Sequence, residues 1–194
     1  MTTMTARTRC ALLALALLTP LTLADYDTGL EAYNKGDWET AARELKPVAD
    51  EGHAHAQFLV GTLFASGSGI ETSLAEALRY YRLSAEQNDG EAQAALGYTY
   101  RVGNGVKQSY DDAAKWYRMA AERGIGDAQF NLGSLYAAGK GVPQSYVQAH
   151  KWFSLAAAHG VDEAVIALFF SITNLNEEQI AEAQLLASEW TPKD

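Results

Sequence analysis

Small and apolar residues recur along most of the chain at spacings of three and four, which is the spacing of one face of an α-helix. Within residues 90–102 the positions on this face are Ala92, Leu96, Gly97 and Tyr100. A turn is expected after this helix, because Gly103 can adopt the left-handed conformation that ends a helix without a Cβ penalty. A second helix is expected to begin at Ser109, whose hydroxyl can accept a hydrogen bond from an unpaired backbone N–H. The pattern therefore predicts two helices joined by a glycine-rich turn.

This pair of helices is repeated with a period of 36 residues. The residues in register include Gly61, Gly97 and Gly133; Gly67, Gly103 and Gly139; Gly69, Gly105 and Gly141; Tyr80, Trp116 and Trp152; and Tyr81, Tyr117 and Phe153. Ser73, Ser109 and Ser145 each precede a second helix, and the residues three positions later, Glu76, Asp112 and Gln148, complete sequences that resemble capping boxes. Self-similarity at a fixed spacing of roughly 20–50 residues indicates a stack of helical units, a solenoid.

One glycine lies inside the first helix of each unit, at Gly61, Gly97 and Gly133. A glycine in a helix costs about 1 kcal/mol relative to alanine. Because the same cost recurs in three units, we expect the backbone there to approach another group closely. The bulky aromatic pair of the second helix is the expected neighbour, so we interpret these aromatic residues as core and not as a cofactor site.

The two ends of the repeated region differ from its middle, as terminal repeats do. We divide the chain into an N-terminal helical hairpin at 25–52, three full units at 53–88, 89–124 and 125–160, and a degenerate capping hairpin at 161–194. The final helix is expected to reach about Trp190. Its apolar positions, on one face, are Ile180, Ala183, Leu186, Ala187 and Trp190. This face is expected to close the stack as an amphipathic lid.

The third unit closely resembles a Sel1-like repeat, a relative of the tetratricopeptide repeat. The resemblance rests on Leu132-Gly133, Tyr136, the Gly139-Lys-Gly141-Val142 turn, Trp152-Phe153 and Ala156-Ala157, and it covers three consecutive units over residues 53–160. It implies an all-α fold, a right-handed α-solenoid of antiparallel helix pairs, in an exported bacterial member of the family. It also implies protein–protein interaction. Some exported Sel1-like proteins carry a disulfide in every repeat and have been discussed as β-lactam-binding proteins, but this chain lacks those cysteines.

Residues 1–24 have the features of a secretory signal peptide. Two arginines, Arg7 and Arg9, precede an apolar run from Cys10 to Leu18, and small residues lead to Ala24. A membrane-spanning helix needs about 20 apolar residues, and Pro20 interrupts this run well before that. We therefore expect cleavage after Ala24, a periplasmic or secreted product without a transmembrane segment, and no cysteine in the mature chain.

The composition narrows the class of partner. The 194-residue chain carries a formal net charge of −9, and losing Arg7 and Arg9 with the signal peptide would make it −11. A nucleic-acid partner would need clustered Lys and Arg, so none is expected. Any charged partner is expected to be basic.

No set of residues indicates catalysis, a metal site or a cofactor. His53 and His55 are two positions apart at the start of a helix, so they point in different directions, and we interpret them as solvated surface. His150 and His159 are nine residues apart on or near one helix, and no paired carboxylate or cysteine accompanies them there. The Gly-x-Gly segments follow helices and not strands, which excludes the usual phosphate-binding context.

The candidate binding residues lie on the concave face that a solenoid presents. They occupy positions on the first helices that face away from the repeated core positions and differ between units, as in a specific binding face or in an unconstrained surface. They are Phe58, Thr62, Tyr98, Arg101, Phe130, Asn131 and Ser134. Aromatic residues and arginine dominate interface energetics. We expect an exported, non-enzymatic scaffold or adaptor that binds a protein or peptide. One alternative is a periplasmic immunity or inhibitor protein that neutralises a toxin or envelope enzyme. Another is an envelope hydrolase, for which no nucleophile and base are visible.

Overall fold

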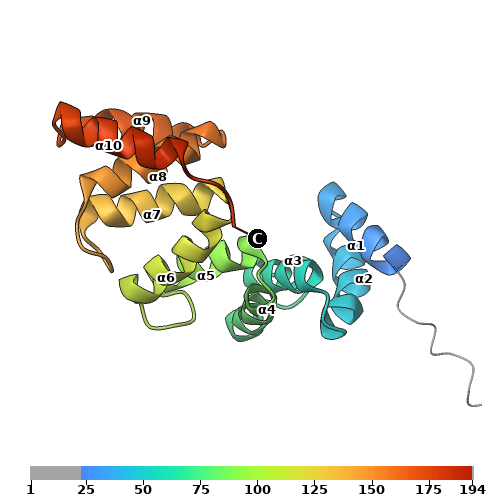
Figure 1. The fold of residues 1–194 in the computed structure, drawn as a ribbon. Coiled ribbons are helices and arrows are strands. Elements are labelled where there is room, and N and C mark those ends of the chain that lie inside the picture. Colours follow the sequence, from blue (N-terminus) through green and yellow to red (C-terminus); the bar gives the residue numbers. More distant parts are fainter. Residues whose placement is uncertain (1–22, 194) are drawn as a thin grey trace, which may run out of the picture.

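The computed structural model describes residues 23–193, which form ten α-helices and no β-strand (Figure 1). The helices are α1 Leu23–Lys35, α2 Trp38–Asp50, α3 Ala54–Ser66, α4 Leu74–Glu86, α5 Gly90–Val102, α6 Tyr110–Glu122, α7 Gly126–Ala138, α8 Tyr146–Ala158, α9 Asp162–Ile172 and α10 Glu177–Ser188. The predicted signal peptide lies outside the described residues except for its last two positions, which begin α1. None of the helices within residues 23–193 has the length and apolar composition that crossing a bilayer requires.

The helices pack in sequential pairs, and each pair packs against the next. α1 lies against α2, α3 against α4, α5 against α6 and α7 against α8, while α2–α3, α4–α5 and α6–α7 join neighbouring pairs. The stack bends into an arc, so that α1 and α9 rise at its two ends on the same side of α4 (Figure 1). The predicted all-α class and the helical solenoid are confirmed.

The turns within the units follow the sequence pattern closely. Helices α3, α5 and α7 end at Gly67, Gly103 and Gly139, which have φ values of +72°, +79° and +64°. The next helix in each unit begins after a serine that accepts a hydrogen bond from the backbone N–H three residues later, as Ser109 does from Asp112 at 3.2 Å. Both bonds of a capping box are formed at Asn176 and Gln179, at the start of α10. At the three serines only the side-chain bond is formed, so these sites are simple N-caps and not the capping boxes that their sequences resemble.

The glycines inside the first helices admit an aromatic ring from the second helix of the same unit. A Cβ at Gly61 would lie 2.7 Å from Tyr81 Cδ1, one at Gly97 would lie 2.5 Å from Tyr117 Cδ1, and one at Gly133 would lie 2.8 Å from Phe153 Cδ1. Carbon atoms that are not bonded prefer separations of about 3.5–4.0 Å. The predicted close approach is therefore confirmed in all three units. The aromatic residue that directly precedes each of these rings is less uniform: Tyr80 and Trp152 are buried, but Trp116 is only partly buried.

Buried glutamines connect successive units, a feature that the periodicity analysis missed. The side-chain amides of Gln57, Gln93 and Gln129 are 36 residues apart, and each donates to a backbone carbonyl of the preceding helix, at 3.0, 3.3 and 3.1 Å. Their acceptors are Ala49, Ala85 and Ala121. These bonds repeat one contact geometry along the stack.

The last two helices depart from the repeat. In place of the glycine at Gly133, α9 carries Phe169 one period later, and its side chain is 65% exposed and not covered by a second helix. The connection to α10 is also shorter, residues 173–176 against residues 139–145 in the preceding unit. Both α9 and α10 consequently pack against α8 and not chiefly against each other.

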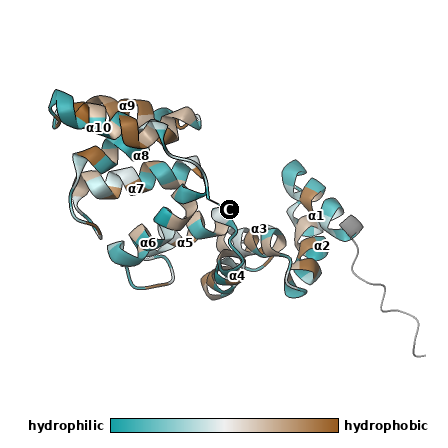
Figure 2. Cartoon of the chain, in the orientation of Figure 1, coloured by the Kyte–Doolittle hydropathy of each residue, from teal (hydrophilic) through white to brown (hydrophobic). Residues whose placement is uncertain are grey.

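The outer side of α9 remains open as a result. Its exposed apolar residues are Val165, Ile166 and Phe169, and α9 is largely hydrophobic in Figure 2. The last helix, α10, was expected to close the stack as a lid, but it leaves the outer side of α9 uncovered. Of the expected lid residues Ala183 is buried, and Ala187 and Trp190 pack on the core formed by α6, α7 and α8. The lid covers α8.

Candidate functional site

Three grooves lie in a row on the concave face, the surface that the first helices α3, α5, α7 and α9 form on the inner side of the arc. The first groove lies between α3 and α5, the middle groove between α5 and α7, and the last groove between α7 and α9, with volumes of about 190, 300 and 410 Å³. An aromatic ring from the second helix lies at the base of each groove. These rings are Tyr81, Tyr117 and Phe153, which are 36 residues apart.

The first and last grooves are the same site two periods apart. Six residues that line the first groove correspond, 72 positions later, to six that line the last. The pairs are Ala65 and Ala137, Leu74 and Tyr146, Tyr81 and Phe153, Ala95 and Ala167, Tyr98 and Phe170, and Thr99 and Ser171. Small alanines on the first helices leave the space, and aromatic and aliphatic side chains supply the apolar walls.

The middle groove differs because Arg101 stands where the other two grooves have Ala65 and Ala137. Arg101 Nε donates to the hydroxyl of Tyr117 at 3.3 Å, and its guanidinium lies 5.1 Å from the centre of the Tyr98 ring. The arginine therefore fills the part of the middle groove that stays open in the first and last grooves. What remains open lies nearer the start of α5 and α7.

Two carboxylates line this open part, Glu91 and Asp127, each the second residue of its helix. Partial burial, together with the negative charges of Asp89 and Asp127, raises the pKa of Glu91. A site that crowds carboxylates in this way favours a bound cation, since a positive charge relieves their mutual repulsion.

An ion pair supports the same end of the groove. His55 Nδ1 lies 3.2 Å from Asp89 Oδ2 and links α3 to the start of α5. The hydrogen bond to Asp89 raises the pKa of His55. Burial opposes ionisation of Asp89, but hydrogen bonds from His55 and from the backbone N–H of Ala92 outweigh it and lower the pKa of Asp89 overall.

The structure brings together several of the candidate binding residues. Phe58, Tyr98 and Asn131 line the middle groove, although they come from three different helices. Ser134 lines the last groove, and Arg101 lies against Tyr117 and Tyr98, which line the middle groove. Tyr98, 52% exposed, lines both the first and the middle grooves.

Two candidates support the aromatic rings at the base of the grooves. Thr62 Oγ1 donates to the carbonyl of Phe58 at 3.1 Å and accepts from the hydroxyl of Tyr81 at 3.4 Å. Phe130 packs against Phe153, with ring centres 5.7 Å apart. We therefore assign Thr62 and Phe130 a supporting position.

Sequence reasoning missed three residues that line the grooves, Glu91, Asp127 and Phe170. Glu91 and Asp127 are 36 residues apart, and Phe170 is 72 residues after Tyr98, so the repeat register contained a signal for each.

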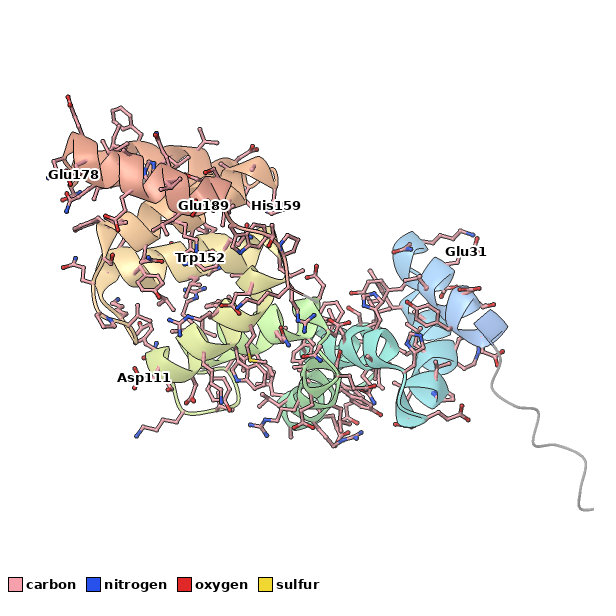
Figure 3. All side chains as sticks on the ribbon, viewed as in Figure 1. Glu31, Asp111, Trp152, His159, Glu178 and Glu189 are labelled. Carbon is pink, nitrogen blue, oxygen red and sulfur yellow. The ribbon has the colours of Figure 1, made fainter. Side chains whose placement is uncertain are left out.

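The histidines have structural partners. His53 Nδ1 accepts from the backbone N–H of Ala56 at 3.2 Å and caps α3, while its ring stacks on Tyr26. His53 is exposed and the His55 side chain is 39% exposed, so both lie at the surface as interpreted, but each also has a structural partner, which the sequence did not indicate. Nδ1 of the buried His150 lies 2.8 Å from Ser171 Oγ. His159, which is labelled in Figure 3 at the end of α8, has its Nδ1 2.8 Å from Gln129 Oε1.

Residues 23–193 contain no cluster of three or more His, Cys, Asp and Glu side chains arranged to hold a metal ion. Much of the acidic surplus is dispersed. Four exposed carboxylates labelled in Figure 3, Glu31, Asp111, Glu178 and Glu189, lie on separate parts of the stack.

Comparison with known proteins agrees with this geometry. A model of the Sel1 repeat matches residues 54–89, 90–125 and 126–161. Among solved structures, a Sel1 repeat protein from Oxalobacter formigenes is 38% identical, with a TM-score of 0.61 over 65% of this chain and 95% of that one. Helicobacter pylori cysteine rich protein B is 25% identical, with a TM-score of 0.55 over 66% of this chain and 94% of that one.

A third solved structure shares the fold alone. It is c5321, a protective antigen present in uropathogenic Escherichia coli strains that displays an SLR fold, with 24% identity and a TM-score of 0.53 over 86% of this chain and 46% of that one. No curated protein sequence matches the chain. Because three consecutive matched repeats span more than half of the residues and the stacked helical pairs agree with them, the chain belongs to the Sel1 repeat family.

Proposed function

We propose that this protein is an exported, non-enzymatic scaffold or adaptor that binds a protein or peptide on its concave face. Sel1-repeat proteins are generally protein-interaction scaffolds. The observation that carries the proposal for this chain is the row of three grooves on one face, with the exposed Tyr98 between the first two. Exposed aromatic side chains in such positions are frequent energetic centres of interfaces.

The partner is proposed to present a basic segment. Two observations support this chemistry: the net charge of −9, and the placement of Glu91 and Asp127 along the middle groove. A negative surface accelerates encounter with a basic partner and discriminates against acidic ones.

Export is part of the proposal and rests on the basic, apolar and small-residue pattern of residues 1–24. Expression of the full chain in a bacterial host, followed by mass spectrometry of the protein recovered from the periplasm, tests it. A mature N-terminus at Asp25 is expected. Recovery only in the cytoplasm with residues 1–24 retained would contradict export.

The decisive experiment for binding is a capture assay from envelope extract with three proteins: wild type, the Tyr98→Ala/Arg101→Ala variant, and Phe169→Ser as a control. Phe169 is 65% exposed and lies outside the three grooves. Wild type and the control are expected to capture the same partner, and the double variant is expected to lose it while keeping its helical circular dichroism. Equal capture by all three would refute binding on the concave face.

The same assay distinguishes a scaffold or adaptor from an inhibitor or immunity protein. If the captured partner is an enzyme whose activity falls on stoichiometric addition of this protein, the chain is an inhibitor or immunity protein. Hydrolysis of a β-lactam or a muropeptide by the purified protein would instead overturn the non-enzymatic assignment.

A further inference from the structure

The three grooves differ in chemistry in a fixed order along the concave face. The first and last grooves are mainly apolar, with Tyr98 and Phe170 at equivalent positions on their walls. The middle groove is lined by Glu91 and Asp127 in addition to aromatic rings. A ligand that crosses all three grooves therefore meets mainly apolar surface throughout, with carboxylates beside it only at the middle groove.

The middle groove suits a single cation more than an apolar side chain. Glu91 and Asp127 supply negative charge, and the exposed ring of Tyr98 offers a π face. Of the nearby cationic groups, His55 is paired with Asp89, and Arg101 is held against Tyr117 and Tyr98. Among residues 23–193, neither carboxylate that lines the groove forms a salt bridge, so a Lys or Arg of a partner can pair with both.

The outer grooves suit large apolar side chains of different size. The last groove, at about 410 Å³, is larger than the first, at about 190 Å³. An aromatic side chain is therefore assigned to the last groove, and a branched aliphatic side chain to the first.

The spacing of the grooves sets the spacing of the ligand. Each groove is separated from the next by one helix, and packed helices lie about 8–10 Å apart. An extended peptide rises about 3.3 Å per residue. Because the open part of the middle groove is also displaced toward the start of α5 and α7, neighbouring grooves are at least about three residues of extended chain apart.

We propose that the concave face binds an extended peptide segment that carries a Lys or Arg with one large apolar residue at least about three positions before it and another at least about three positions after it. This proposal rests on the proposed concave-face function and names the partner chemistry of that face. The fixed charge at the centre and the two fixed pockets also set the register in which the peptide lies.

The chain itself suggests a way to close the grooves one at a time. Arg101 already fills the position that Ala65 holds in the first groove and Ala137 holds in the last. Both alanines are partly exposed, so Ala65→Arg and Ala137→Arg introduce the side chain that the middle unit already tolerates. Ala181→Arg, at an exposed position on α10 outside the grooves, is a matched control for the added charge.

The test is fluorescence anisotropy with a labelled seven-residue peptide that has Leu and Phe at its two ends, Lys at its centre, and Ser and Gly between, in both orders of the ends. For the better order, replacing Lys by Glu, or moving one apolar residue one position closer to the Lys, is expected to raise Kd at least about ten-fold. Ala65→Arg and Ala137→Arg are each expected to do the same, whereas Ala181→Arg leaves Kd within about two-fold. Glu91→Gln/Asp127→Asn is expected to remove the preference for Lys over Glu.

Several outcomes overturn the proposal: no saturable binding of either Lys peptide up to about 1 mM, equal Kd for the Lys and Glu peptides, or equal effects of Ala65→Arg and Ala181→Arg. If any of these peptide results is found while partner capture still depends on Tyr98 and Arg101, only the proposed order of apolar and cationic residues in the peptide is refuted. Loss of that dependence in the capture assay refutes the concave-face function itself.

Discussion

The substitution Gly97→Ala tests the contact on which each repeat is built. A Cβ at this position would lie 2.5, 2.7 and 2.8 Å from Cδ1, Cε1 and Cγ of Tyr117. Since carbon atoms prefer about 3.5–4.0 Å, the ring would have to move by about 1 Å. Tyr117 is only 1% exposed, and its hydroxyl accepts a hydrogen bond from Arg101, so it has little space into which to move.

The magnitude follows from two opposing effects. Alanine is more favourable than glycine in a helix by about 1 kcal/mol. Overpacking of a well-packed core costs about 1–3 kcal/mol and occasionally more, and a 1 Å displacement of a buried ring belongs at the upper end of that range. We therefore expect a net loss of about 1–2 kcal/mol in the free energy of unfolding, which corresponds to a fall in Tm of about 2–8 °C for a domain of this size.

Thermal and urea unfolding followed by circular dichroism at 222 nm measure this loss. Gly61→Ala and Gly133→Ala are expected to act in the same direction, because a Cβ there would lie 2.7 Å from Tyr81 and 2.8 Å from Phe153. In a Tyr117→Leu background the clash is relieved, and Gly97→Ala should become neutral or stabilising. An unchanged or higher Tm for Gly97→Ala alone would refute the argument that close packing, and not helix preference, selects glycine here.

Three further predictions concern other parts of the stack. His55→Gln should remove a stabilisation of up to about 1 kcal/mol that the wild type has near pH 5.5 and loses as the pH rises through the raised pKa of His55. The lowered pKa of Asp89 keeps its carboxylate charged, so the contribution of Asp89 is lost only under more acidic conditions. An equal difference in urea midpoint near pH 5.5 and pH 8.5 would contradict the ion pair. Ser109→Ala should cost about 1 kcal/mol in urea unfolding through loss of the α6 N-cap, whereas the same loss for the exposed Ser188→Ala would show that the cap is not the cause. Phe169→Ser, at a 65% exposed site, should change stability by less than about 0.5 kcal/mol, and a loss like the roughly 2–5 kcal/mol expected for a buried Leu→Ala change would show that the outer side of α9 is covered.

Much of the local structure could be predicted because it depends on neighbours in the sequence. The helix expected over residues 90–102 is α5, and the serine expected to start the next helix caps α6. The contact between Gly97 and Tyr117 was also predictable, since it occurs within one unit and recurs with the period. By contrast, the partner of His55 lies 34 residues away and follows no repeated register.

The candidate site was predicted as a face but not as a set of grooves. Tyr98 and Phe58 were identified because they vary at positions turned away from the core, and both line the middle groove. The carboxylates of Glu91 and Asp127 were missed, because at a helix start an acidic residue is already explained by capping and by the helix dipole. Only the packing of α5 beside α7 shows that the two carboxylates line one open space.

The sequence by itself determined the repeat, the helix pairs, their turns and the glycine that each aromatic ring requires, because these depend on steric and hydrogen-bonding rules that act within one period. The tertiary structure alone decided where α10 lies and which grooves remain open. Phe169 in the glycine register indicates that the repeat ends at α9. Whether α10 packs on α8 or on α9 was decided by which helix offered the better packing in the folded stack, and α10 packs on α8. In the same way, whether Arg101 fills a groove or extends into solvent depends on Tyr98 and Tyr117, which meet only in the folded stack.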